Sequence, residues 1–540
     1  MNETNLLDGL SRPVVGVPEV AAEESATGLR AVVRRLAAAP AAVTWAVVGV
    51  GLAFAGLLRF WELGRLGYNS DEAVYAGQAA AIANVHDLQP YFPLFRAHPL
   101  LFQTIHSLGY RLGVGEFSGR LLAAAFGVGT IAVVYATGKL LYGRKAGAIA
   151  ALLIALMPYD VLVSRQVLLD GPTTFFATVS LYLLVRYSLT RERAWLLGAA
   201  GVLGLAVLSK ETSILMVGAV YAFIALSPEI GVRLRDMGPA LASFIGVVLA
   251  YPVALRLAGH SQAGQHYLAY QLFRRPNHAF SFYPTQVPLA MGVLVVCAAV
   301  LGLWVLRGEI SWRETLLLSW IAIPALFFQL YPVKGFQYLL PTAPAVALLA
   351  GRTLARWRPP SIRLPVLRRT LSGAWIATLL VAATAASLAV PSWARIQPSS
   401  SQTFLAGSGG LPGGREVGRW IRGHVPEGAE LLAIGPSMAN VVQFYGHRRT
   451  YGLSVGTNPL RRNPAYDPLP NPDLSIRTND VQYLVWDAFS AARTPFFSNK
   501  LLGYVRRYNG RIVHLESTQV ESSAGHSVRK PLIVVYAVRP

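Results

Sequence analysis

The residues Tyr68-Asn69-Ser70-Asp71-Glu72-Ala73-Val74-Tyr75 follow the first long apolar segment of the chain, Ala41 to Phe60, almost at once. An apolar segment of about 20 residues is long enough to cross a bilayer. Ser70 followed by two acids is typical of a helix N-terminus, with a hydroxyl as the cap and negative charge in the first turn. The stretch therefore predicts a helix that begins where a membrane span meets water, with Asp71 and Glu72 in its first turn.

The composition is that of a protein embedded in a bilayer. Of 540 residues, 53% are hydrophobic and only 14% are charged, whereas about 25% charged residues are usual in soluble proteins. We expect a polytopic α-helical protein of the plasma membrane with about 11 transmembrane helices. The expected spans lie at about 41–60, 119–138, 146–163, 169–187, 194–209, 212–228, 238–258, 287–306, 314–332, 336–352 and 370–390.

The net charge of +21 is explained by topology rather than by nucleic-acid binding. With residues 1–40 as a cytoplasmic tail, every loop on the cytoplasmic side is basic, and residues 352–369 carry six arginines and no acid. Cytoplasmic loops collect Lys and Arg. This assignment of the loops to the two sides of the membrane places Asp71, Asp170 and the chain after 391 on the extracytoplasmic side. Membrane lipids are expected partners, and nucleic acid is not.

The chain divides into a membrane domain and a soluble one. Residues 41–390 form the expected transmembrane domain, whose long outer loop at 61–118 should carry two surface helices, from Ser70 and from Pro99. A linker rich in Ser and Gly at 399–414 follows. Alternating helix and strand signals then predict a soluble, extracytoplasmic α/β domain over 391–540. The single cysteine of the chain excludes a disulfide framework.

Several short motifs resemble those of one known family. Asp71-Glu72 after the first span, His98-Pro99-Leu100-Leu101 and Glu116-Phe117-Ser118-Gly119-Arg120 are similar to motifs of the GT-C glycosyltransferases, above all the protein O-mannosyltransferases and the bacterial aminoarabinose-transferase-like enzymes. Further matches are Ser164-Arg165 with Asp170, Leu208-Ser209-Lys210, and Lys334 to Pro341. The resemblance implies a GT-C type membrane domain, a polyprenyl-phosphate sugar donor, an outward-facing site and an inverting reaction. The sugar, a hexose or a pentose, and the acceptor, a protein, lipid or glycan hydroxyl, stay open.

Such a transfer needs a base for the acceptor hydroxyl, and Asp71 is the expected one. Glu72 and Asp170 are the other candidate catalytic carboxylates. Glu72 would hold a neighbouring cation or orient the loop, and Asp170 would contact the sugar or acceptor, or share a divalent cation with Asp71. The alternatives are a helix-dipole role for Asp71 and an ion pair between Asp170 and Arg165. The sequence defines no metal site, so a divalent cation is an open cofactor.

Basic residues on the expected outer side need an explanation other than the positive-inside rule. Binding of the lipid phosphate supplies one, and pairing with lipid headgroups or with acids such as Glu211 is the alternative. His98 would touch the phosphate or the acceptor, or be structural, and Tyr338 would hold the phosphate or pack in the core. The expected substrate-binding residues are His98, Arg165, Lys210, Arg274, Arg275, Lys334 and Tyr338.

Two other function classes also fit a polytopic chain. A secondary transporter is one, but the spans lack the two-half symmetry that transporters often carry. A non-catalytic scaffold for cell-envelope assembly is the other. The presence of Asp71, Asp170 and Lys210 together argues against a scaffold.

Overall fold

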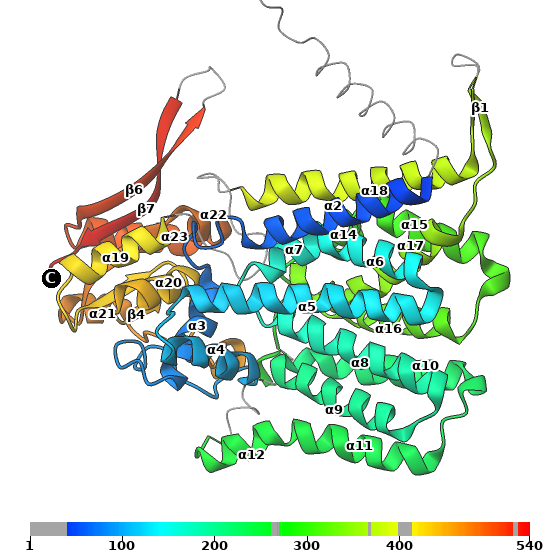
Figure 1. The fold of residues 1–540 in the computed structure, drawn as a ribbon. Coiled ribbons are helices and arrows are strands. Elements are labelled where there is room, and N and C mark those ends of the chain that lie inside the picture. The colour runs from blue at the N-terminus through cyan, green and yellow to red at the C-terminus, as the bar shows by residue number, and fades with distance from the viewer. Residues whose placement is uncertain are drawn as a thin grey trace, which may run out of the picture.

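The computed structural model describes residues 40–260, 267, 269–271, 273–364, 369–397, 413–521 and 527–540. The predicted cytoplasmic tail and nearly all of the predicted linker lie outside the described residues. The described chain forms a helical body from residues 40–397 and an α/β unit from residues 413–540, and the two pack against each other (Figure 1). The sequence likewise predicts a helical domain followed by a C-terminal α/β domain.

The helices of the body coincide with the expected spans, each of which contains one helix or a broken pair of helices. The α-helices are α2 (Pro40–Phe60), α5 (Phe117–Tyr142), α6 (Arg144–Leu156), α7 (Pro158–Ser164), α8 (Asp170–Thr190), α9 (Arg193–Ser209), α10 (Leu215–Leu226), α11 (Leu234–Val248), α12 (Ala250–Leu257), α14 (Phe282–Met291), α15 (Val293–Val305), α16 (Trp312–Leu330), α17 (Ala343–Arg356) and α18 (Gly373–Ile396). Short 3-10 turns join them: η1 (Glu211–Ile214), η2 (Pro228–Ile230), η3 (Arg307–Glu309) and η4 (Phe336–Thr342).

The helices support a multi-pass membrane protein. Among the described residues, five are long and apolar enough to cross a bilayer, or seven if each of two bent pairs counts as one span. The pair α6 and α7 bends by 60°, where Pro158 lacks the N–H that would continue the helix. The pair α14 and α15 bends by 97° at Gly292, whose φ of 90° favours glycine. A total of 11 crossings therefore stays a prediction.

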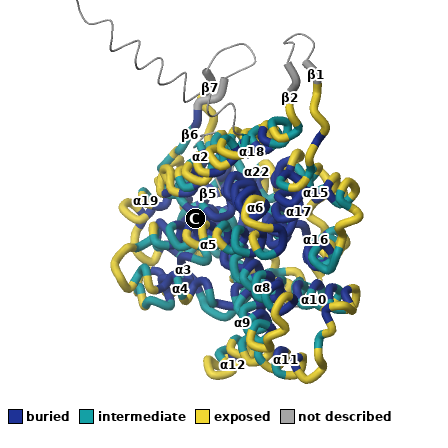
Figure 2. Tube along the Cα trace, turned by 45° about the vertical axis from the view of Figure 1, so that its right-hand side comes forward, coloured by how far each residue is buried: buried dark blue, intermediate teal, exposed yellow. Residues whose placement is uncertain are grey.

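Helix α6 lies at the centre of the body. Its residues from Ala146 to Leu156 are all buried, as expected of a helix that is apolar on every side. It contacts α2, α5, α17 and α18. A Cβ at Gly138 of α5 would lie 2.6 Å from the Cα of Gly147 of α6, so glycines on both helices permit this close approach. Exposed residues concentrate on α11 and α12 at one edge (Figure 2).

The outer loop contains the two helices that the sequence predicts, α3 (Ser70–Ile82) and α4 (Leu101–Arg111). The cap of α3 differs from the prediction, because Asn69 rather than Ser70 occupies the N-cap position. The Asn69 side chain accepts a hydrogen bond from the Glu72 N–H, and the Glu72 carboxylate accepts one from the Asn69 N–H, each at 3.0 Å. This reciprocal capping box fixes the start of α3.

The α/β unit contains one mixed five-stranded sheet of order β4-β3-β5-β7-β6. Its parallel strands are β3 (Glu430–Ala433), β4 (Thr450–Gly452) and β5 (Val481–Asp487), and its antiparallel strands are β6 (Arg511–Glu521) and β7 (Ser527–Ala537). The accompanying helices are α19 (Gly414–His424), α20 (Pro436–Gly446), η5 (Pro459–Arg461), α21 (Pro472–Arg477), α22 (Ala488–Arg493) and α23 (Pro495–Arg507). A separate hairpin, β1 (Ile362–Leu364) and β2 (Arg369–Leu371), lies at the opposite end of the body (Figure 1).

The outer loop and the α/β unit share a single apolar core. Tyr68 and Phe92 from the loop pack in one cluster with Phe444 and Tyr445 from α20. Helix α20 also packs directly against α3. Burial of large aromatic side chains on both sides makes this a firm interface, so the α/β unit is docked on the loop that carries Asp71.

Candidate active site

A cavity of about 1100 Å³ lies where the helical body, the outer loop and the α/β unit meet. Binding sites for small molecules usually have volumes of about 300–1,000 Å³, so this one has room for more than one small ligand. Its lining comes from segments far apart in the sequence. The chemically active lining residues include Asp71, Tyr75, His98, Lys210, Glu211, Tyr267, Arg274, His278, Lys334, Tyr338, Arg395, Asn463, Tyr466 and Arg493.

Asp71 lines this cavity from the first turn of α3. Tyr75 lies one helical turn further on, and Tyr466 reaches the same space from the α/β unit. Burial, and then the charge of the Asp71 carboxylate, raise the pKa of both phenols. Asp71 therefore stands among neutral phenols on the wall of a partly closed cavity, which suits a carboxylate that acts as a base.

Glu72, predicted as a catalytic carboxylate, is fully buried and is not among the residues that line the cavity. Its oxygens accept hydrogen bonds from Arg120 Nε and Nη2, both at 2.8 Å, and from the Val167 N–H at 3.0 Å. Adjacent residues of a helix point about 100° apart, which explains why Asp71 faces the cavity and Glu72 faces the body. Of its predicted roles, the geometry favours holding a cation and orienting the loop, and it gives no access to a substrate.

Asp170 pairs with Lys210 and not with Arg165. The Lys210 ammonium lies 2.8 Å from Asp170 Oδ1, and both residues are almost fully buried. Lys210 also lies over the ring of Tyr338, 4.6 Å from its centre. Arg165 instead donates to the carbonyls of Leu58 and Trp61, at 2.6 and 2.8 Å. The alternative of an Asp170–Arg165 ion pair is therefore wrong, and Arg165 does not line the cavity.

Lys334 and Arg274 place cationic groups on the cavity wall. The Lys334 ammonium donates to the carbonyls of Gln329 at 2.8 Å and Tyr331 at 3.2 Å, at the C-terminal end of α16. A cation is stabilised there by the helix dipole, and these hydrogen bonds hold the Lys334 side chain in place. Arg274 lines the cavity, whereas Arg275 is exposed and does not.

His98 lies in a polar group on the cavity wall. Its Nδ1 lies 2.8 Å from Glu211 Oε2, and its Nε2 lies 3.3 Å from the Tyr267 hydroxyl. Both predicted roles, contact with substrate and a structural bond, are compatible with this position. Glu211 thus pairs with His98 rather than with Arg274 or Lys334. Pairing with lipid headgroups stays the other alternative to phosphate binding for these two residues.

Sequence reasoning missed the lining residues that come from the α/β unit, Asn463, Tyr466, Phe489 and Arg493. They are about 400 residues away from Asp71 in the sequence, and no motif marks them. Among the described residues, no group of three or more His, Cys, Asp or Glu is arranged to hold a metal ion. A divalent cation therefore stays a prediction.

Known proteins resemble this chain in sequence and in fold. A family model described as dolichyl-phosphate-mannose-protein mannosyltransferase matches residues 97–255. ArnT from Cupriavidus metallidurans superposes with a TM-score of 0.63 at 16% identity, over 92% of this chain and 98% of ArnT. The oligosaccharyltransferase AglB from Archaeoglobus fulgidus superposes with a TM-score of 0.53 at 15% identity, over 90% of this chain and 74% of AglB. In fold, and over part of its sequence, the chain therefore resembles GT-C glycosyltransferases.

Curated relatives match over part of their length. An undecaprenyl phosphate-alpha-4-amino-4-deoxy-L-arabinose arabinosyl transferase of Pectobacterium carotovorum is 27% identical over 319 residues, 55% of this chain and 56% of the relative. An uncharacterized protein of Aquifex aeolicus is 26% identical over 304 residues, 53% of this chain and 60% of the relative. The chain thus spans little more than half the length of these relatives. The cavity of this chain brings together the predicted residues Asp71, His98, Lys210, Arg274, Lys334 and Tyr338.

Proposed function

We propose that this protein is a membrane glycosyltransferase that moves a sugar, a hexose or a pentose, from a polyprenyl-phosphate donor to an acceptor hydroxyl, with inversion at the anomeric carbon. The observation that carries the proposal is that Asp71 and the cations of Lys210, Arg274 and Lys334 line one cavity. Two structural neighbours support the donor class, since ArnT was solved with undecaprenyl phosphate and AglB with a dolichol-phosphate. The acceptor is a protein, lipid or glycan hydroxyl.

The proposed chemistry assigns a task to each wall of the cavity. Asp71 removes the proton of the acceptor hydroxyl as its oxygen attacks the anomeric carbon. The bond from that carbon to the phosphate oxygen breaks on the opposite face, and a single displacement of this kind inverts the configuration. Arg274 and Lys334 stabilise the negative charge that develops on the leaving phosphate. Lys210 contributes less charge, because Asp170 compensates it at 2.8 Å.

The site would face the extracytoplasmic side of the plasma membrane. Helix α17 follows directly on η4, whose residues Phe336 to Tyr338 line the cavity, and it ends in the arginine-rich segment 352–369. The cavity and the basic loop therefore lie at opposite ends of this helix. Because basic loops stay in the cytoplasm, this arrangement supports an outward-facing cavity and an extracytoplasmic α/β unit.

Sugar transfer by the purified protein tests the proposal. Wild type would be given a panel of synthetic polyprenyl-phosphate sugars with protein, lipid and glycan acceptors, beside the variants Asp71→Asn and Asp87→Asn. Asparagine keeps the size of the side chain but is a very poor base, so Asp71→Asn should lower kcat by about 100-fold or more. Asp87→Asn is the matched control, because Asp87 is an exposed acid of the same outer loop.

The outcomes of this test separate the enzyme from its proposed base. Loss of transfer in Asp71→Asn, with Asp87→Asn equal to wild type, supports both. Transfer that survives in Asp71→Asn removes Asp71 from the chemistry and turns attention to Asp170. Failure of the wild type with every donor overturns the enzyme and leaves the transporter and scaffold alternatives.

A further inference from the structure

The amide of Gln271 holds the side chain of Arg274 on the wall of the large cavity. Gln271 Oε1 accepts a hydrogen bond from Arg274 Nη1 at 3.1 Å, and the guanidinium lies over the ring of Tyr270, 5.4 Å from its centre. All three residues line the cavity. An arginine side chain has several rotatable bonds and loses much rotamer freedom when it is fixed. These two contacts therefore decide where the charge of Arg274 lies.

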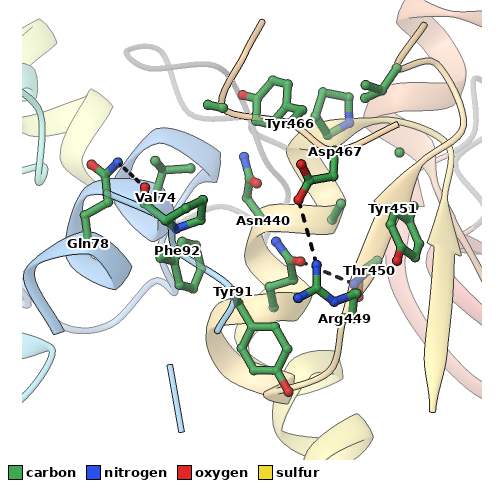
Figure 3. A pocket seen from close by; sticks show the side chains of 17 residues that line it. Val74, Gln78, Tyr91, Phe92, Asn440, Arg449, Thr450, Tyr451, Tyr466 and Asp467 are labelled. Atoms are coloured by element: carbon green, nitrogen blue, oxygen red, sulfur yellow. Dashed lines mark hydrogen bonds and ion pairs between the residues drawn. The ribbon is translucent and has the colours of Figure 1, made fainter. Parts of the chain in front are cut away.

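The partner of Arg274 in this hydrogen bond is neutral, whereas other cations of the chain are held by acids. Lys210 lies 2.8 Å from the carboxylate of Asp170. Arg449 and Asp467 line a separate cavity of about 50 Å³ between the outer loop and the α/β unit, where their side chains lie 3.8 Å apart (Figure 3). A neighbouring carboxylate offsets part of the attraction that a cation has for another anion. The amide of Gln271 orients a guanidinium without this offset.

The orientation of the Gln271 amide follows from its neighbours. Arginine can only donate hydrogen bonds, so the amide oxygen faces Arg274 and the NH₂ group faces away from it. The NH₂ group donates to the hydroxyl oxygen of Tyr267 at 2.6 Å. Tyr331, which directly follows α16, shares its hydroxyl hydrogen between the Gln271 carbonyl at 3.0 Å and Oε1 at 3.2 Å. Both ends of the amide are thus fixed by printed neighbours of known donor or acceptor character.

Tyr267 connects the amide to the outer loop. Because the Tyr267 oxygen accepts from Gln271, its own hydrogen is available to His98, whose Nε2 lies 3.3 Å away. His98 Nδ1 in turn lies 2.8 Å from Glu211 Oε2. The hydrogen-bonded chain contains, in order, Arg274, Gln271, Tyr267, His98 and Glu211. It joins three segments that are far apart in the sequence, with Gln271 as the only amide among them.

We propose that Gln271 is a positioning residue for Arg274: its neutral amide, fixed by Tyr267 and Tyr331, aims the guanidinium at the phosphate of the polyprenyl-phosphate donor. This inference rests on the proposed function, because it assigns the group that orients one of the phosphate-binding cations. Both ends of the amide are required, the oxygen to hold Arg274 and the NH₂ group to hold Tyr267. A carboxylate at residue 271 would keep the first bond, lose the second and add a negative charge beside the phosphate.

Binding of undecaprenyl phosphate to the purified, detergent-solubilised protein tests the inference separately from sugar transfer. In Gln271→Met the side chain keeps its length but cannot hold Arg274, so Kd should rise about tenfold. In Gln271→Glu the added charge repels the phosphate, so Kd should rise by about 30-fold or more. If Gln271 only fills space, Gln271→Glu should be the milder change, because glutamate has nearly the same size.

The matched control is Gln329→Met. It removes a side-chain amide of α16 that donates to the Phe280 carbonyl at 2.8 Å, and Gln329 is not among the residues that line the cavity. Its Kd should match wild type. Melting temperatures are measured for every variant, and binding is expressed per folded molecule.

A double variant tests whether Gln271 acts through Arg274. Arg274→Met should weaken binding by itself, and Gln271→Met added to it should weaken binding no further, because both changes break one interaction. Additive losses, or a Gln271→Glu protein that binds as well as Gln271→Met, would overturn the inference. The loss in Arg274→Met would then leave the proposed function standing. Equal binding by wild type and Arg274→Met would overturn the proposed role of Arg274 at the phosphate, and the inference with it.

Discussion

Replacing Glu72 by glutamine tests whether the two adjacent carboxylates of the outer loop have different roles, a structural one for Glu72 and a catalytic one for Asp71. Glu72 is fully buried, and its partner Arg120 is 6% exposed. We expect Glu72→Gln to destabilise the fold strongly and to lower transfer only through the loss of folded protein. Asp71→Asn should behave in the opposite way, with normal stability and with kcat lowered by about 100-fold or more.

The size of the effect follows from the four donors that Glu72 accepts. Its Oε1 accepts from Arg120 Nε and the Val167 N–H, and its Oε2 accepts from Arg120 Nη2 and the Asn69 N–H. In glutamine one of these oxygens becomes an NH₂ group, and in either orientation this group faces one donor of Arg120 and one backbone N–H. The guanidinium also loses its counter-charge. Breaking a buried ion pair of this kind costs about 3–5 kcal/mol of the free energy of unfolding.

Thermal unfolding of the detergent-solubilised protein measures this effect, followed by transfer assayed per folded molecule. The control is Glu62→Gln, which alters an exposed pair with Arg65 in the same loop and should change stability by about 0.5 kcal/mol or less. A Glu72→Gln protein with the wild-type melting temperature but no transfer would refute the reasoning. That result would make Glu72 a candidate catalytic carboxylate again, as the sequence predicts.

Two further predictions concern stability away from the cavity. Burial lowers the pKa of His106 from 6.5 to about 4, so between pH 6.5 and pH 4 the unfolded chain binds a proton that the folded chain does not. Roughly 3 kcal/mol of the free energy of unfolding should therefore be lost as the pH falls across that window. When melting is followed at both pH values, His106→Leu should lose less stability than wild type. In Gly147→Ala the new Cβ would lie 2.6 Å from the Lys139 backbone nitrogen, so α5 and α6 must separate at a cost of about 1–3 kcal/mol. Gly49→Ala, with no atom within 4 Å, is its control, and equal melting temperatures for the two would contradict the packing argument.

The helical body could be predicted because its signals are local. Apolar runs of bilayer length, interrupted by basic or polar turns, place each helix within a few residues of its position in the structure. The start of α3 could be placed from its acids and polar cap, although Ser70 is the predicted cap and Asn69 occupies the cap position in the structure. A shift of one residue is expected, because both side chains are good caps.

The partners of the charged residues could not be predicted, since they depend on long-range packing. Arg165 is close to Asp170 in sequence, yet Lys210 reaches Asp170 from the end of α9. Glu72 and Asp71 are neighbours in the sequence, but only the orientation of α3 against the body decides which one faces the cavity. Tyr466 carries no motif at all, and its place follows from the docking of the α/β unit on α3.

The composition of α3 explains how one carboxylate can be held with accuracy between two domains. All of its buried residues other than Glu72 and Gln78 are Ala, Gly or Ser, and a Cβ at Gly77 would lie 2.3 Å from the Phe92 ring. Small side chains let backbones approach closely, so the helix is fixed by its surroundings rather than by long flexible contacts. At its N-terminal end, Arg120 from the helical body donates to Glu72, and Asn440 from the α/β unit donates to Ser70. A base that is held from both sides is more often correctly oriented for reaction than one on a free loop, so its reaction is faster. For this physical reason we expect changes in the α/β unit to alter kcat more than KM.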